Sequence, residues 1–123
     1  MYRIKDSIFR IENGKQFGTG FLCKIPFSYT EEFLVLITCN HVLDEESLLN
    51  RAISLKNEKG TFTIEKNEKR KYYISKEDFD TTIIEIIEPD IIHKAKFLDV
   101  DSNNYSIASL TKYNAYLFHY QNN

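Results

Sequence analysis

The stretch Phe17-Gly-Thr-Gly-Phe-Leu-Cys-Lys-Ile25 decides the fold class of this chain. Its aromatic and β-branched residues favour an extended strand. Gly18 and Gly20 predict positions at which a neighbouring backbone or side chain passes close to that strand. An Asn-Gly pair at 13–14 is typical of a tight turn, so we expect a chain reversal immediately before the strand.

The remaining apolar runs also have strand character. Residues 33–38 (FLVLIT) form an apolar run that is too short for a helix and rich in strand formers. Residues 40–49 (NHVLDEESLL) predict one short helix, with Asn40 as a possible N-cap. Further strands are expected at 52–56, 61–66, 71–75, 81–87 and 114–120, and an irregular one through Ile4, Ile8 and Ile11. Six or seven short strands and one helix predict an all-β chain, arranged as a closed antiparallel barrel or a sandwich.

Charge and composition exclude several classes of function. The 123 residues include 16 basic and 18 acidic ones, so no overall charge favours nucleic acid or an anionic membrane as a partner. The densest basic run, residues 66–71 (KNEKRK), is expected to be a solvated hairpin edge. Neither a signal peptide nor a bilayer-spanning run is recognisable, and two cysteines do not make a disulfide framework. We therefore expect a cytoplasmic protein in a reducing compartment.

Three segments in a fixed order stand out as candidates for chemistry. They read GTGFL at 18–22, LITCNHVL at 36–43 and FDTTIIEI at 79–86. A histidine follows the second apolar run, and an aspartate opens the third.

In this order, the segments resemble the trypsin-like (chymotrypsin-fold) serine peptidases. The similarity is greater to the disulfide-poor branch that includes the bacterial high-temperature-requirement proteases, with segments such as GSGF, LTNNHVV and DIALLKI. It covers residues 17–87. The resemblance implies a six- or seven-stranded barrel like the N-terminal barrel of these proteases at 1–90 and a connector at 91–112. Residues 113–123 would then be the first strand of a second barrel that is absent or truncated.

The resemblance also implies roles for two residues. His41 matches the general base, which takes a hydroxyl proton and returns it to the leaving amine. Asp80 matches the carboxylate that orients the imidazole, and Asp78 is the competing candidate for that role. Gly18 and Gly20 match glycines that let their strand pass close behind the histidine.

The nucleophile of the family has no recognisable counterpart. In the family it is a serine in a glycine-flanked loop, and no glycine of this chain follows Asp80. Ser102 has the right order but lies in a polar turn. The chain is therefore expected to be a truncated or partial serine endopeptidase that is inactive alone. Two alternatives are a non-catalytic module that binds proteins, peptides or its own copies through an exposed barrel face, and an unrelated small barrel.

Cysteine and metal chemistry are less favoured by the sequence. Cys39 lies two residues before His41, but Cys39 and Cys23 both lie in apolar runs and are expected to be packing residues. His41, His93 and His119 are widely spaced, so we assign no metal and no cofactor. His93 is expected to be solvated.

Overall fold

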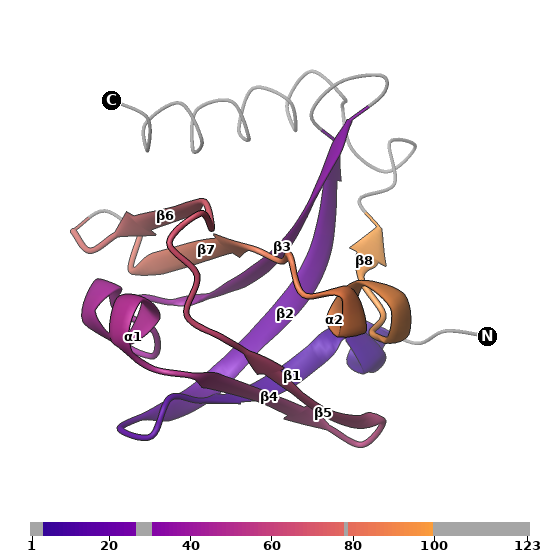
Figure 1. The fold of residues 1–123 in the computed structure, drawn as a ribbon, viewed down its shortest axis with the longest axis horizontal. Coiled ribbons are helices and arrows are strands. Elements are labelled where there is room, and N and C mark those ends of the chain that lie inside the picture. Colours follow the sequence, from indigo (N-terminus) through magenta and orange to yellow (C-terminus); the bar gives the residue numbers. More distant parts are fainter. Residues whose placement is uncertain (1–3, 27–30, 78, 100–123) are drawn as a thin grey trace.

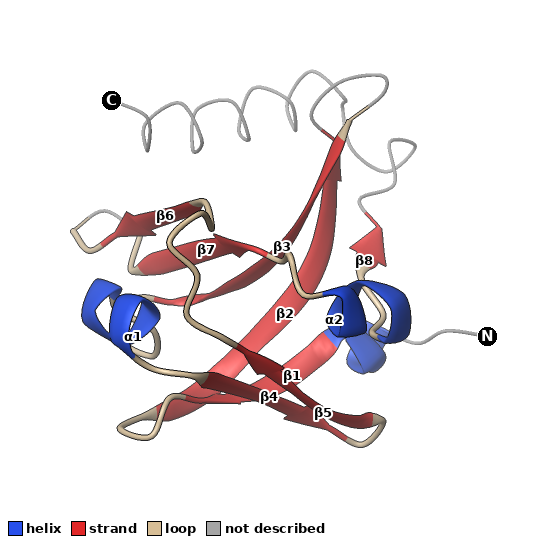
Figure 2. Cartoon of the chain, in the orientation of Figure 1, coloured by secondary structure: helices blue, strands red, loops and turns tan. Residues whose placement is uncertain are grey.

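The computed structural model describes residues 4–26, 31–77 and 79–99. In these residues the chain forms mostly β-strands, with short helices at the side (Figures 1 and 2). The elements are η1 (Ile4–Ser7, a 3-10 helix), β1 (Ile8–Glu12), β2 (Phe17–Pro26), β3 (Glu32–Cys39), α1 (Glu45–Asn50), β4 (Ile53–Asn57), β5 (Gly60–Ile64), β6 (Tyr72–Ser75), β7 (Thr81–Glu85), α2 (Pro89–Lys94) and β8 (Leu98–Asp99). The prediction of an all-β chain is confirmed.

All the strands belong to a single sheet. Its order is β5-β4-β1-β2-β3-β7-β6, with antiparallel pairing throughout, and β8 adds to β2 in parallel. The long strands β2 and β3 cross the molecule diagonally, with β1, β4 and β5 at one end and β6 and β7 at the other (Figure 1). Within the described residues β5 and β6 end the order without pairing with each other, so no hydrogen-bonded ladder closes the sheet.

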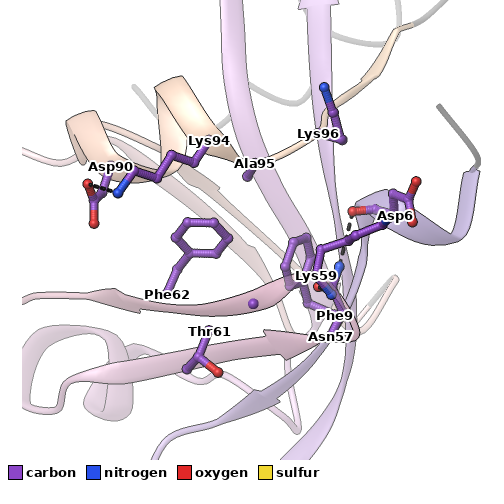
Figure 3. Close-up of a pocket in the computed structure, with 11 residues that line it drawn as sticks. Asp6, Phe9, Asn57, Lys59, Thr61, Phe62, Asp90, Lys94, Ala95 and Lys96 are labelled. Carbon is purple, nitrogen blue, oxygen red and sulfur yellow. Dashed lines mark hydrogen bonds and ion pairs between the residues drawn. The ribbon is translucent and has the colours of Figure 1, made fainter. Parts of the chain in front are cut away.

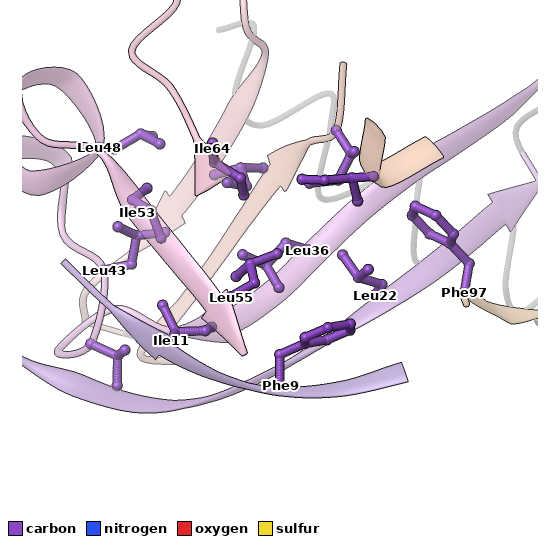
Figure 4. Close-up of a cluster of buried hydrophobic side chains, with 14 residues drawn as sticks. Phe9, Ile11, Leu22, Leu36, Leu43, Leu48, Ile53, Leu55, Ile64 and Phe97 are labelled. Carbon is purple, nitrogen blue, oxygen red and sulfur yellow. The ribbon is translucent and has the colours of Figure 1, made fainter. Parts of the chain in front are cut away.

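The central strands are apolar on both faces. Leu22, Leu36 and Ile84 point into the main core, which also contains Phe9 and buried side chains of β4 and β5 (Figure 4). Their neighbours along the chain point to the opposite face because side chains alternate in a strand. There Cys23, Val35, Tyr73, Ile83 and Ile25 form a second buried cluster. Burial on both faces explains why residues 33–38 are continuously apolar.

The two glycines of β2 lie where side chains approach it closely. A Cβ atom on Gly18 would be 2.4 Å from Cγ2 of Val42. A Cβ atom on Gly20 would be 2.3 Å from Cδ1 of Ile11 and 2.9 Å from the carbonyl oxygen of Ile37. The expectation of close approach at both glycines is confirmed, and it lets the residues after His41 pack against β2.

A buried ion pair joins the two ends of the open sheet. The guanidinium of Arg70 pairs with the carboxylate of Glu88, and their side chains are only 3% and 16% exposed. Arg70 also donates to the carbonyl of Glu65 after β5 (3.0 Å) and to that of Glu85 in β7 (2.6 Å). Glu88 accepts in addition from the backbone N–H of Glu65 at 3.2 Å. This polar network connects the chain after β5 with β7. It therefore spans the seam, the gap between β5 and β6 where no ladder forms.

The burial of Arg70 corrects the expectation that residues 66–71 are a solvated edge. Lys66, Lys69 and Lys71 are exposed, as expected, but Arg70 is 6% exposed. A guanidinium can be buried at this position because carbonyls and a carboxylate satisfy its planar donors. The sequence pattern gave no sign of those partners, which lie before and after the run.

The helix after His41 is shorter than predicted. Asp44, not Asn40, is the N-cap of α1, and its carboxylate accepts a hydrogen bond from the backbone N–H of Ser47 at 2.9 Å. Asn40 is buried, and its side chain donates to Oγ1 of Thr82 instead, at 3.4 Å. Residues 40–43 form a turn, so a short helix in this segment is confirmed but its start at Asn40 is wrong. The expectation of a single helix is also wrong, because α2 and the 3-10 helix η1 are present as well.

The structure also differs from the expected strand through Ile4 and from the expected connector at 91–112. Ile4 lies in η1 and is exposed, whereas β1 buries Phe9 and Ile11. Residues 91–99, which belong to the expected connector, contain most of α2 and all of β8, and place Ile91 and Phe97 in the main core. The expected strand at 114–120, which contains His119, lies outside the described residues, and so does Ser102.

We predict that replacing Arg70 with methionine lowers the free energy of unfolding by about 3 kcal/mol, because it leaves the buried Glu88 carboxylate unpaired. Urea denaturation measures this loss. The control is Lys94→Met, which removes an exposed ion pair with Asp90 (3.4 Å). It should change stability by less than about 0.5 kcal/mol. Equal losses in the two variants would contradict the role of Arg70 at the seam.

Candidate functional site

His41 lies in the turn that follows β3, between two buried neighbours. Asn40 and Val42 are 8% and 4% exposed, whereas the side chain of His41 is 68% exposed. The backbone N–H groups of Val42 and Leu43 both donate to the carbonyl of Cys39, at 3.0 and 3.1 Å. The buried residues anchor the turn in the core and leave the imidazole at the surface.

Side chains from two other elements hold the same turn. The amide of Asn13, in the turn between β1 and β2, donates to the carbonyl of Val42 at 2.9 Å. The hydroxyl of Thr82, in β7, donates to the carbonyl of Leu43 at 2.7 Å. Both Asn13 and Thr82 are buried. The backbone around His41 is therefore tied both to the turn between β1 and β2 and to β7.

Asp80 lies directly before β7 and faces His41. Pairing of Cys39 with Thr81 in the β3/β7 ladder brings the two loops together. The backbone of Asp80 has a φ of 45°, a left-handed conformation that aspartate tolerates better than most residues. Its carbonyl accepts from the N–H of Asn40 at 3.0 Å, and its Oδ1 accepts from the N–H of His41 at 3.1 Å. Its Oδ2 lies 2.6 Å from Nδ1 of His41.

These contacts determine the electrostatics of the pair. The hydrogen bond from the His41 side chain is the main cause that lowers the pKa of Asp80 below its usual value of 3.8. An ionised carboxylate only accepts hydrogen bonds, so Nδ1 of His41 is the donor. In neutral histidine the other ring nitrogen, Nε2, is then left as the proton acceptor. The arrangement can hold the imidazole in one tautomer and orientation.

The structure thus brings together the two residues that the sequence singled out, His41 and Asp80. It supplies no third member of a triad, because no serine follows Asp80 among the described residues. The competing candidate Asp78 lies outside them. His93 is exposed on α2, as expected.

The two cysteines have different environments, and both are free thiols. Cys23 is buried, and its burial raises the pKa of the thiol to about 11, which fits a packing residue. Cys39 was expected to pack in the same way, but this is wrong because the residue is exposed. It is the last residue of β3, beyond the part of the strand that is covered on both faces.

One grouping was missed by the sequence reasoning. Potential ligand atoms of Cys39, His41 and Asp80 all lie within 4.8 Å of one another. The short Cys-x-His spacing was visible, but the third member lies 39 residues after His41 and is brought in only by the β3/β7 pairing.

A separate cavity of about 520 Å³ lies between β5 and α2, away from His41 (Figure 3). Phe9, Phe62, Lys59 and Lys94 line it, and Lys94 pairs with Asp90. None of the residues of the His41 loop lines this cavity, so it contributes nothing to the candidate site.

Comparison of the chain with protein-family models, with curated proteins and with solved structures finds no match. Among the described residues, no helix has the length and apolar character needed to span a bilayer.

We predict a stability difference between the wild type and Asp80→Asn that depends on pH. The lowered pKa of Asp80 means that its ionised form stabilises the fold. This contribution is fully present above the usual pKa of 3.8 and is lost as the pH falls through the lower value of the folded state. Asparagine keeps one side-chain oxygen that accepts hydrogen bonds, and it tolerates the left-handed backbone at this position. The substitution therefore tests the effect of removing the negative charge.

Urea denaturation at pH 6 and at pH 3 or below measures the effect. The wild type should be the more stable protein at pH 6, and the difference should shrink in acid. In a His41→Ala background the same comparison should show much less pH dependence. An equal difference at both pH values would contradict the role of the His41 hydrogen bond.

Proposed function

We propose that this chain provides the histidine and aspartate of a trypsin-like serine endopeptidase. His41 is the general base and Asp80 the residue that orients it. The observation that carries the proposal is the 2.6 Å contact between Nδ1 of His41 and Oδ2 of Asp80. It joins two loops in the order that the resemblance implies, and it leaves Nε2 facing away from the carboxylate.

The fold class is compatible with a barrel like the N-terminal barrel of these proteases. Support comes from the single antiparallel path of strands and from the Arg70/Glu88 network across its open seam. The close approach of the Val42 side chain to Gly18 also supports the family role of this glycine behind the histidine.

The proposed reaction is hydrolysis of a peptide bond through an acyl-enzyme. A serine hydroxyl attacks the carbonyl carbon while Nε2 of His41 takes its proton, and the proton then passes to the leaving amine. Water repeats the sequence and releases the acid. The nucleophile and the oxyanion hole have no counterpart among the described residues, so we propose that a further segment or a partner supplies them. The chain of 123 residues alone is then inactive.

We predict that a fluorophosphonate probe, which labels activated serines, does not react with the purified chain. In the protein isolated from its native cells, the probe should label the polypeptide that carries the nucleophile. That labelling should fall at least about 100-fold in His41→Ala, because the serine loses its base. Lys94→Met serves as the matched surface control and should label normally.

Intact mass of the isolated protein identifies the labelled polypeptide. Undiminished labelling in His41→Ala, or no labelling of any copurifying chain, would contradict the proposal. We place this activity in the cytoplasm, where both thiols of the chain stay reduced.

A second candidate function is supported by the open sheet. In the described residues β5 and β6 are both end strands, and each offers one edge of backbone groups to an incoming strand. Exposed Phe79 lies close to the end of β6 in the chain. A peptide, or a second copy of the chain, could add to such an edge.

This candidate predicts self-association or binding of a hydrophobic dye by the purified chain. Sedimentation equilibrium should then give a mass above 14.5 kDa. Ile74→Pro in β6 should lower the association, because the alternation of the β6/β7 ladder points the N–H of Ile74 away from β7 and toward the free edge. A strictly monomeric chain that binds no dye would contradict it. Thr61→Pro in β5 tests the other edge in the same way.

A further inference from the structure

We propose that Cys39, His41 and Asp80 form a binding site for Zn²⁺. Three different ligand types meet at one point of the surface, with their ligand atoms within 4.8 Å of one another. Around an ion at about 2.0–2.3 Å from each ligand, the corners of a tetrahedron lie about 3.3–3.8 Å apart, so side-chain movements of about 1 Å would bring the three ligands into that geometry. The inference does not rest on the peptidase proposal.

The ligand set favours zinc over the hard cations. Thiolate and imidazole are ligands of zinc and of softer metals, whereas Ca²⁺ and Mg²⁺ prefer sites made of oxygen alone. Three protein ligands leave a fourth position for water. The side chains of His41 and Asp80 are 68% and 49% exposed, so the fourth position is open to solvent.

The backbone holds the ligands in place before an ion binds. The turn after Cys39 is closed by the N–H groups of Val42 and Leu43, and the loop of Asp80 is tied to Asn40 at 3.0 Å. Oδ1 of Asp80 accepts a hydrogen bond from the N–H of His41 at 3.1 Å, so Oδ2 is the oxygen that would bind the ion. Such support reduces the entropic cost of assembling the site.

The ion would take the place of the proton that lies between Nδ1 of His41 and Oδ2 of Asp80. Nδ1 now faces Oδ2 at 2.6 Å, so an ion bound by both atoms separates them slightly. The thiol proton of Cys39 is released to solvent, and the Nδ1 proton moves to Nε2, so that no redox partner is required. A zinc ion here occupies the nitrogen that Asp80 would otherwise orient, so it would block the proposed base.

The test uses the reduced, metal-free chain and Co²⁺ as a spectroscopic probe. We expect one Co²⁺ per chain, with the near-ultraviolet charge-transfer band of a thiolate ligand, and displacement of the cobalt by Zn²⁺. Cys39→Ser should abolish that band. His41→Ala and Asp80→Asn should each weaken Zn²⁺ binding by at least about 10-fold. Circular dichroism checks that each variant is folded, and the exposed positions of the three residues make this the expected result.

Cys23→Ala is the matched control, because it removes the other thiol and leaves the proposed site intact. Its cobalt spectrum should equal that of the wild type. Absence of the band, one ion shared between two chains, or a spectrum that depends on Cys23 would overturn the proposal. The measurement needs no catalytic activity, so its failure would leave the peptidase proposal untouched, and failure of serine labelling would leave the zinc site untouched.

Discussion

The antiparallel pairing of β3 with β7 is the constraint on which the candidate site depends. It aligns Cys39 with Thr81, and so brings the turn of His41 next to the loop of Asp80. The ladder is stabilised by apolar side chains on both of its faces, with Leu36 and Ile84 in the main core and Val35 and Ile83 in the second cluster. Because burial on both faces leaves little freedom to shift the register, the two loops keep their separation.

The site is therefore rigid where it joins the sheet and open where it meets solvent. Buried Asn13 and Thr82 hold the backbone after His41, while the imidazole and the carboxylate remain accessible. A fixed backbone with an accessible side chain suits a residue that exchanges protons with another molecule. It also suits a residue that binds a metal ion taken up from solvent. The same geometry thus supports both the proposed general base and the proposed zinc ligand, which would compete for one nitrogen.

Most of the elements could be predicted from the sequence because strand formation is a local property. The runs at 17–25 and 33–38 correspond to β2 and β3, and the glycines of β2 lie where close contacts require them. The errors concern residues whose surroundings come from distant segments. The helix begins after Asp44 because Asn40 bonds to Thr82, and Arg70 is buried because Glu88 and two carbonyls meet it across the seam.

The sequence by itself determined the all-β character, the approximate extent of the strands and the choice of His41 and Asp80 as candidates. The strands follow from side-chain periodicity, which acts over a few residues, and the choice of the two candidates follows from the resemblance of short motifs to a known family. Tertiary structure alone decided the 2.6 Å contact between that pair, the exposure of Cys39 beside it and the burial of Arg70. The physical reason is that each of these depends on which strands pair and in what register, and that choice minimises the free energy of the whole sheet and not that of any one segment.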